Sequence, residues 1–144
     1  RARAAAVGDP ANSPALAALL AFTDARLALN TGNPRPDLVR QAHHAGLYDR
    51  YATAATAELA AATHHPEAEQ LVEAAQRAAE ENDWAAACLA RARGRLHDDQ
   101  KALHESLTTW ERLGARYERA RTLALIPGRE PEAASELSAW GVDP

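Results

Sequence analysis

Residues that tolerate a left-handed backbone conformation recur along this chain at a nearly regular spacing. They are Gly8, Gly46, Asn82 and Gly114, and the interval between them shortens slightly toward the C-terminus. Aromatic residues follow three of them at a similar spacing, as Tyr48, Trp84 and Tyr117. Self-similarity at about 33–40 residues, with two helices per period, is typical of a helical solenoid. We therefore expect stacked helical hairpins.

The composition favours helices throughout. Alanine dominates an apolar fraction of 47%, and aromatic residues make up 5% of the chain. Isoleucine occurs once, as Ile126, and no segment alternates Val, Ile or Thr with polar residues. Because alanine has a high helix propensity and a low strand propensity, an all-α fold is expected.

Turn-forming segments divide the 144 residues into one domain with four predicted hairpins. The hairpins are expected at 13–45, 47–81, 83–113 and 115–140, after a preceding helix tail and turn at 1–12. Gly114 is expected to end a helix with a positive φ, which glycine adopts without a steric penalty. Since the chain contains no methionine, we expect it to be a fragment of a longer protein.

Charge and hydropathy set limits on the partners. The net charge is −4 and the isoelectric point about 5.9, which does not indicate a dedicated nucleic-acid-binding protein. The longest apolar run, at 15–22, is too short to span a bilayer, and no signal peptide is evident. A cytoplasmic protein without membrane partners is expected. Cys88 is the single cysteine and is predicted to be buried and unreactive.

The C-terminal part of the chain resembles a known class of repeat regions. The segments are "ALHESLTTWERLGARYERARTLALI" and "EPEAASELSAWGV", within a match over about 83–140. They are similar to the tetratricopeptide-like region of MalT-like and LuxR-like ATP-binding transcriptional regulators of bacteria. The repeat regions of related signalling cyclases and ATPases contain a similar sequence motif. The resemblance implies a degenerate tetratricopeptide-like α-α superhelix of about four antiparallel hairpins, since no unit carries the full repeat pattern.

No motif predicts catalysis, a metal or a cofactor. A zinc site needs three or four converging ligands, whereas the histidines occur as two adjacent pairs and two single residues: His43, His44, His64, His65, His97 and His104. "HESLT" at 104–108 begins like a zinc-protease motif, but Thr108 replaces the second histidine. Glycine-rich phosphate loops are also missing from the sequence. We expect a protein that is not an enzyme.

Arginines concentrate in the second half of the chain. Residues 83–129 contain nine Lys/Arg and six Asp/Glu, while the remainder contains seven and fourteen. Five of these arginines are spaced so that they could line the groove of a solenoid and bind an acidic peptide or a phosphate: Arg91, Arg95, Arg112, Arg116 and Arg119. The alternative is a solvated face with helical partners such as Glu105, Glu111 and Glu118.

Three functional hypotheses follow. The first is a non-catalytic interaction module of a bacterial transcriptional regulator, which binds a peptide, a protein or an inducer and couples this to neighbouring domains in signal transduction. The second is a self-associating scaffold whose groove is occupied by another copy. The third, less favoured, is direct nucleic-acid binding through the arginines of residues 83–129, which would weaken steeply with salt.

Overall fold

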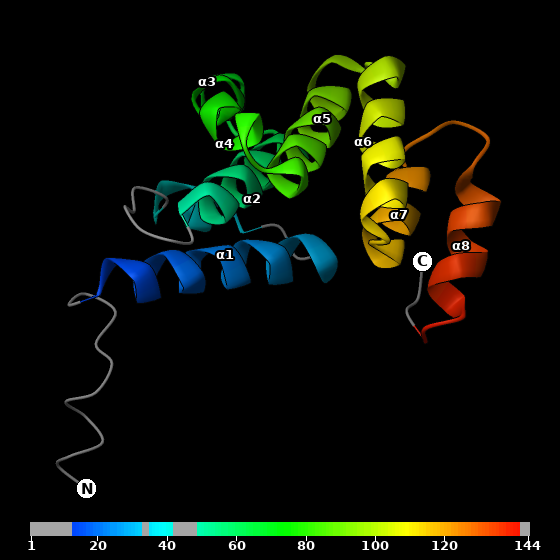
Figure 1. Cartoon of the computed structure of the whole chain (residues 1–144), viewed down its shortest axis with the longest axis horizontal. Helices are drawn as coiled ribbons and strands as arrows, with labels where there is room; N and C mark the ends of the chain where they lie inside the picture. The colour runs from blue at the N-terminus through cyan, green and yellow to red at the C-terminus, as the bar shows by residue number, and fades with distance from the viewer. Residues whose placement is uncertain (1–12, 33–34, 42–48, 142–144) are drawn as a thin grey trace, which may run out of the picture.

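The computed structural model describes residues 13–32, 35–41 and 49–141 (Figure 1). All regular secondary structure in these ranges is helical, which confirms the predicted all-α fold. Gly8, Gly46, Tyr48 and the predicted tail at 1–12 lie outside the described residues, as do His43 and His44.

The described residues form a succession of helices along the chain. They are α1 (Pro14–Asn30), the 3-10 helix η2 (Pro36–Gln41), α2 (Asp49–Ala62), α3 (Ala68–Ala74), α4 (Gln76–Glu80), α5 (Asp83–His97), α6 (Gln100–Leu113), α7 (Arg116–Leu123) and α8 (Glu130–Ser138).

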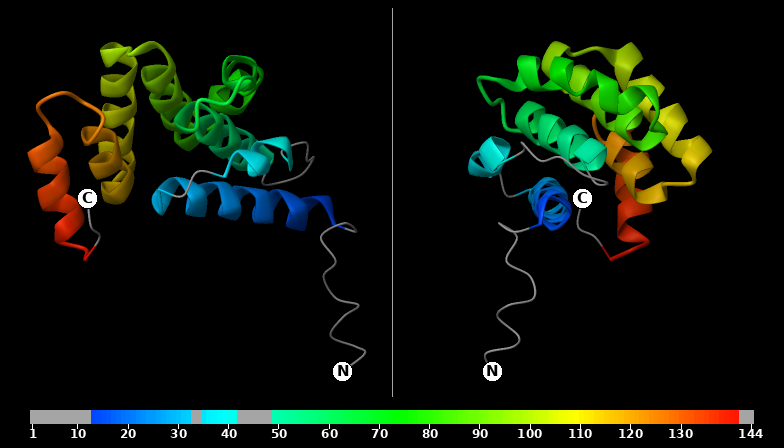
Figure 2. Two further views of the ribbon diagram at one scale, coloured as in Figure 1. Left: turned by 180° about the vertical axis from the view of Figure 1, so that it is seen from behind. Right: turned by 60° about the vertical axis from the view of Figure 1, so that its left-hand side comes forward.

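Consecutive elements pack as pairs. α1 contacts η2, α2 contacts α3 and α4, α5 contacts α6, and α7 contacts α8. These pairs lie within the four ranges in which hairpins are predicted. The first helices of the first three pairs also pack on one another, because α2 lies between α1 and α5, whereas α7 packs on α6. Figure 2 shows α1 along one side of α2, with α7 and α8 at the other end of the row of helices.

Helix α2 is the most enclosed element. Nine of its residues are buried: Ala52, Ala54, Ala55, Thr56, Ala57, Glu58, Leu59, Ala60 and Ala61. A helix that is apolar on nearly all sides must be covered by neighbours, and its alanines allow α1 and α5 to approach closely. The alanine-rich composition therefore builds the centre of the fold.

The turns between helices are specified by individual residues. Gly114 ends α6 with φ +67, as predicted. Asn82 differs from the expectation of a left-handed residue: its backbone is extended (φ −144, ψ 101) and its side chain accepts a hydrogen bond from the Ala85 amide. It is thus an N-cap of α5, which satisfies an otherwise unpaired helix amide. The left-handed residue of the next turn is Asp98, with φ 52.

Two further differences concern single residues. The predicted second helix of the 47–81 unit is divided into α3 and α4 at Ala75. Trp140 is not part of the last helix, which ends at Ser138, but lies in the turn that follows.

Gly94, isolated in the sequence, lies inside α5 where a Cβ would overlap the Leu103 side chain. It allows α5 and α6 to pack closely.

Candidate functional site

A row of four buried or largely buried charged residues crosses the first helices of the four pairs. These residues are Arg26 in α1, Glu58 in α2, Arg91 in α5 and Glu118 in α7. We call them the ionic row. The side chains of Arg91 and Glu58 are each 2% exposed, and those of Arg26 and Glu118 are 11% and 13% exposed. The row alternates in sign along the helices.

Ion pairs connect every neighbour in the ionic row. Arg91 Nε lies 2.6 Å from Glu58 Oε1, and Arg91 Nη2 lies 2.6 Å from Glu118 Oε2. Arg26 Nη1 lies 3.1 Å from Glu58 Oε2, and its other terminal nitrogen contacts Glu118. Arg91 also donates at 3.0 Å to the Glu118 carbonyl and to the Thr122 hydroxyl. The row therefore closes a ring that joins α1 directly to α7.

Two tryptophans cover the arginines of the row. The Arg91 guanidinium lies 5.3 Å from the ring centroid of Trp110, and that of Arg26 lies 5.4 Å from the centroid of Trp84. The two rings themselves meet edge to face with centroids 6.0 Å apart. These contacts place Trp84 and Trp110 between helices and add cation–π attraction to the row.

Burial and ion pairing shift the pKa values of the charged groups in opposite directions. Burial alone would raise the pKa of Glu58, but the positive charges of Arg91 and Arg26 outweigh it and lower the pKa to about 2. Burial would lower the pKa of Arg91, whereas Glu58 and Glu118 raise it above its ordinary value. Glu58 and Arg91, the two most buried members of the row, are consequently charged at neutral pH.

The position of Glu118 differs from the interpretation of a solvated helix face. Its carboxylate is largely buried and pairs with Arg91 and Arg26, which are 27 and 92 residues away in sequence. Arg91, one of the five arginines predicted to bind a partner, likewise forms its ion pairs with carboxylates of this chain. The ionic row thus fills the space between the first helices with the chain's own charges.

Of the other four predicted arginines, Arg116 and Arg119 lie together at a pocket between α7 and α8, and Arg95 and Arg112 lie elsewhere. Arg95 lies one turn after Arg91 and borders two small cavities. Arg112 is exposed and pairs with Asp83 at 2.7 Å. Arg119 contacts three carboxylates, those of Glu111, Glu132 and Glu136. Arg116 is exposed and is in no ion pair with the described residues.

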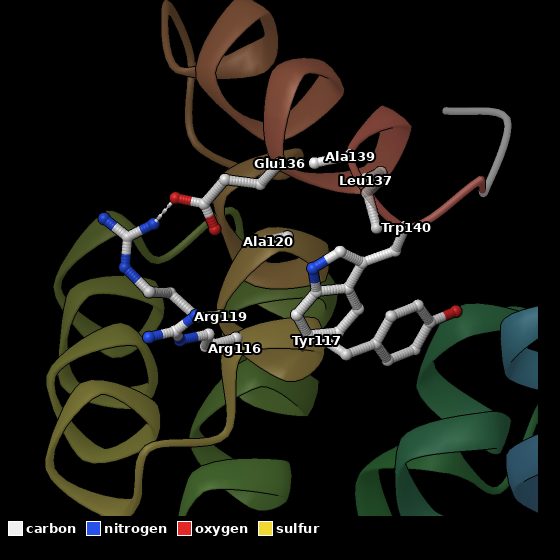
Figure 3. Close-up of a pocket in the computed structure, with 8 residues that line it drawn as sticks. All are labelled: Arg116, Tyr117, Arg119, Ala120, Glu136, Leu137, Ala139 and Trp140. Carbon is white, nitrogen blue, oxygen red and sulfur yellow. Dashed lines mark hydrogen bonds and ion pairs between the residues drawn. The ribbon is translucent and has the colours of Figure 1, made fainter.

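A surface pocket of about 380 Å³ lies between α7 and α8. Eight residues line it: Arg116, Tyr117, Arg119, Ala120, Glu136, Leu137, Ala139 and Trp140. We call it the α7–α8 pocket. The Tyr117 and Trp140 rings are stacked at an interplanar angle of 16°, with centroids 6.1 Å apart, on the side opposite Arg119 and Glu136 (Figure 3). Half of Trp140 is exposed.

The α7–α8 pocket combines an apolar and a polar side. Leu137 and Ala120 are buried beneath the aromatic pair, while the Arg119–Glu136 contact closes the polar side (Figure 3). Because Arg119 is already surrounded by carboxylates, Arg116 is the arginine of the pocket whose charge is available to a ligand. Arg116 is among the five arginines predicted from the sequence to bind a partner, whereas the stacking of Tyr117 on Trp140 is not predicted by it.

Other chemistry is limited in the described part of the chain. No group of three or more His, Cys, Asp or Glu side chains there could hold a metal ion. Cys88 is completely buried, and burial raises the pKa of its thiol well above the usual value, as expected for an unreactive cysteine. None of the helices in the described ranges is long and apolar enough to cross a membrane.

Comparison of the chain with protein-family models, curated proteins and solved structures found no match.

Proposed function

We propose that this chain is a non-catalytic interaction module that binds a short segment of a partner protein in the α7–α8 pocket. The observation that carries the proposal is the half-exposed Trp140 stacked on Tyr117 beside Arg116, an arginine in no ion pair with the described residues. Exposed aromatic and arginine side chains are the types that most often dominate binding energy at protein interfaces. A role in a bacterial transcriptional regulator is part of the proposal and rests on the resemblance of residues 83–140.

The preferred segment would carry a leucine or phenylalanine next to a carboxylate. The apolar side chain would pack against Trp140 and Leu137, and the carboxylate would pair with Arg116 through two parallel hydrogen bonds. Such a contact would use the exposed side of Trp140 and the charge of Arg116, which is in no ion pair with the described residues.

Fluorescence anisotropy tests this with labelled decapeptides that contain one Leu or Phe flanked by Asp, or by Lys as a control set. We expect the acidic set to bind the 144-residue chain with a Kd on the order of 10–100 µM. Trp140→Ala and Arg116→Glu should each weaken binding at least tenfold. Arg112→Glu, which changes an exposed arginine outside the pocket, should not. Equal binding of both peptide sets, or no effect of Trp140→Ala, would contradict the proposal.

Self-association is the second candidate, because the exposed Trp140 could also meet a second copy. Sedimentation velocity over a concentration series distinguishes the two. A mass that stays monomeric favours partner binding, whereas a dimer lost in Trp140→Ala makes the scaffold the better interpretation. A charge reversal at Arg91 could not serve as this test, because Arg91 belongs to the buried ionic row and its reversal would unfold the protein.

A further inference from the structure

A second arginine-lined cavity lies at one end of the ionic row, one helical turn beyond it. Its volume is about 160 Å³, and it is lined by residues of four elements or of the turns that follow them: Ala28, Leu29, Gly32, Leu59, Ala62, Thr63, Arg95 and Arg121. It shares no lining residue with the α7–α8 pocket. An inference about this cavity therefore does not rest on the function proposed for that pocket.

Arg95 differs sharply from Arg91 although both lie on the same face of α5. Each polar nitrogen of Arg91 has a partner in the ionic row or on α7. The Arg95 Nε is buried and has no hydrogen-bond partner among the described residues. No nitrogen of the Arg95 guanidinium group is in a hydrogen bond or ion pair with the described residues, and only Nε is enclosed, so the terminal nitrogens are left for an acceptor from outside the chain.

The charge around Arg95 is not balanced locally. Arg121 lines the same cavity and is fixed by donating to the carbonyls of Leu29, at 2.6 Å, and Asn30, at 3.3 Å. Glu58 is near enough to act on Arg95, but its two oxygens are already paired with Arg26 and Arg91. Burial and the positive charges of Arg91 and Arg121 lower the pKa of Arg95. Two arginines thus border a small cavity that no described carboxylate lines.

A neighbouring cavity of about 220 Å³ shares Arg95 and Ala62 with the first. Asp98 and His64 lie on its border, and both are exposed. The Asp98 carboxylate accepts a hydrogen bond from Gln100 and forms no ion pair with Arg95. The space on this side provides a route from solvent to the arginine.

We propose that the cavity bordered by Arg95 and Arg121 binds a carboxylate carried by a short branched apolar group. The planar fork of Arg95 suits the two oxygens of a carboxylate. The remaining walls are apolar, formed by Ala28, Leu29, Leu59 and Ala62, and the Thr63 hydroxyl already donates to the Leu59 carbonyl. A phosphate, with oxygens on all sides, would leave some of them without donors against these walls.

Titration of the 144-residue chain with isovalerate, followed by NMR of the backbone amides and the arginine Nε–H groups, tests the proposal. We expect saturable shifts of the Arg95 Nε–H signal with a Kd on the order of 1 mM. Arg95→Met should weaken binding at least tenfold, while Arg93→Met, on the same helix outside the cavity, should leave it within twofold. Arg95→Lys keeps the charge but loses the fork, and should weaken binding even where Arg95→Met fails to fold.

Three further probes define the chemistry. The neutral isostere isovaleramide and inorganic phosphate should both bind at least tenfold more weakly than isovalerate. Acetyl-Ala-Leu with a free carboxylate distinguishes the source: tighter binding than isovalerate supports a peptide C-terminus, and weaker binding supports a free small acid. The proposal is overturned by the absence of saturable binding up to 50 mM, on the order of fifty times the expected Kd, by equal binding of isovaleramide or phosphate, or by unchanged affinity in both Arg95 variants.

Discussion

The ionic row and the carboxylates around Arg119 use the same pairing of arginine with glutamate in opposite environments. In the row, Arg91 and Glu58 are each 2% exposed and connect helices far apart in sequence. Around Arg119, the partners Glu132 and Glu136 are 39% and 35% exposed and lie on the adjacent helix α8. Solvent screens exposed pairs, which contribute little, whereas removal of one member of a buried pair leaves an uncompensated charge. The comparison teaches that burial, and not the number of ion pairs, decides which of these arginines hold the fold.

The largest effect is expected from Glu58→Gln. The change removes the negative charge between Arg26 and Arg91 and leaves two largely buried guanidinium groups with one carboxylate, that of Glu118. We expect the free energy of unfolding to fall by about 3–5 kcal/mol. Urea denaturation followed by circular dichroism measures this. Glu132→Gln is the matched control at the surface, and an equal loss in both variants would remove the distinction between the two regions.

Acid should weaken the ionic row over a defined pH range. Glu58 has a pKa of about 2 in the folded chain and 4.5 as its ordinary value. A carboxyl group with a lowered folded pKa stabilises fully above its unfolded pKa, and this stabilisation is lost as the pH falls from about 4.5 to 2. The loss expected from Glu58 is about 3 kcal/mol, from the difference between the two pKa values. Urea denaturation at a series of pH values should show a smaller loss over this range in Glu58→Gln than in the original chain; parallel curves would contradict it.

Much of the fold can be predicted from the sequence because breakers and caps act locally. The alanine content predicts helices, Gly114 predicts a left-handed helix end, and the surroundings of Cys88 predict its burial. Asn82 lies at the predicted start of a helix, but as the N-cap of α5 and not as a left-handed residue. An asparagine side chain can cap the following helix as well as tolerate a positive φ, so its presence alone does not distinguish the two.

The ionic row could not be predicted from composition, since charge counts do not show which residues face one another. The sequence nevertheless contains a pattern that predicts part of the ionic row. Arg26, Glu58 and Arg91 recur at nearly equal intervals, close to the repeat period, and Glu58 interrupts an alanine-rich run. Reading the charges in the repeat register would have placed opposite signs on successive first helices. The pairing of Arg91 with Glu118 spans a shorter interval, depends on how α7 approaches α1 and has no such local signal.

An intermediate effect is expected at Gly94, where the chain packs tightly without charge. Gly94→Ala would place a Cβ against the Leu103 side chain, so α5 and α6 would have to separate or Leu103 would have to change rotamer. We expect a loss of about 1–3 kcal/mol in the free energy of unfolding, which is typical of overpacking. Thermal denaturation measures it. A stabilised variant, as expected for alanine at an unstrained helix position, would show that Leu103 adapts without cost and that the close packing of α5 on α6 does not depend on glycine at this position.

The smallest effect is expected from Arg119→Ala, although Arg119 has more carboxylate partners than any arginine of the ionic row. Its partners are exposed or half-buried, and the pairs around it are on the surface of α6, α7 and α8. We expect a loss below about 1 kcal/mol that becomes smaller between 0.05 and 0.5 M salt, a range in which the screening length falls from more than about 10 Å to about 4 Å. Urea denaturation at the two salt concentrations checks both parts. A loss as large as that of Glu58→Gln at low salt, strongly reduced at high salt, would mean that the three carboxylates around Arg119 repel one another when it is removed, and that proximity of like charges, as well as burial, sets the energy of these clusters.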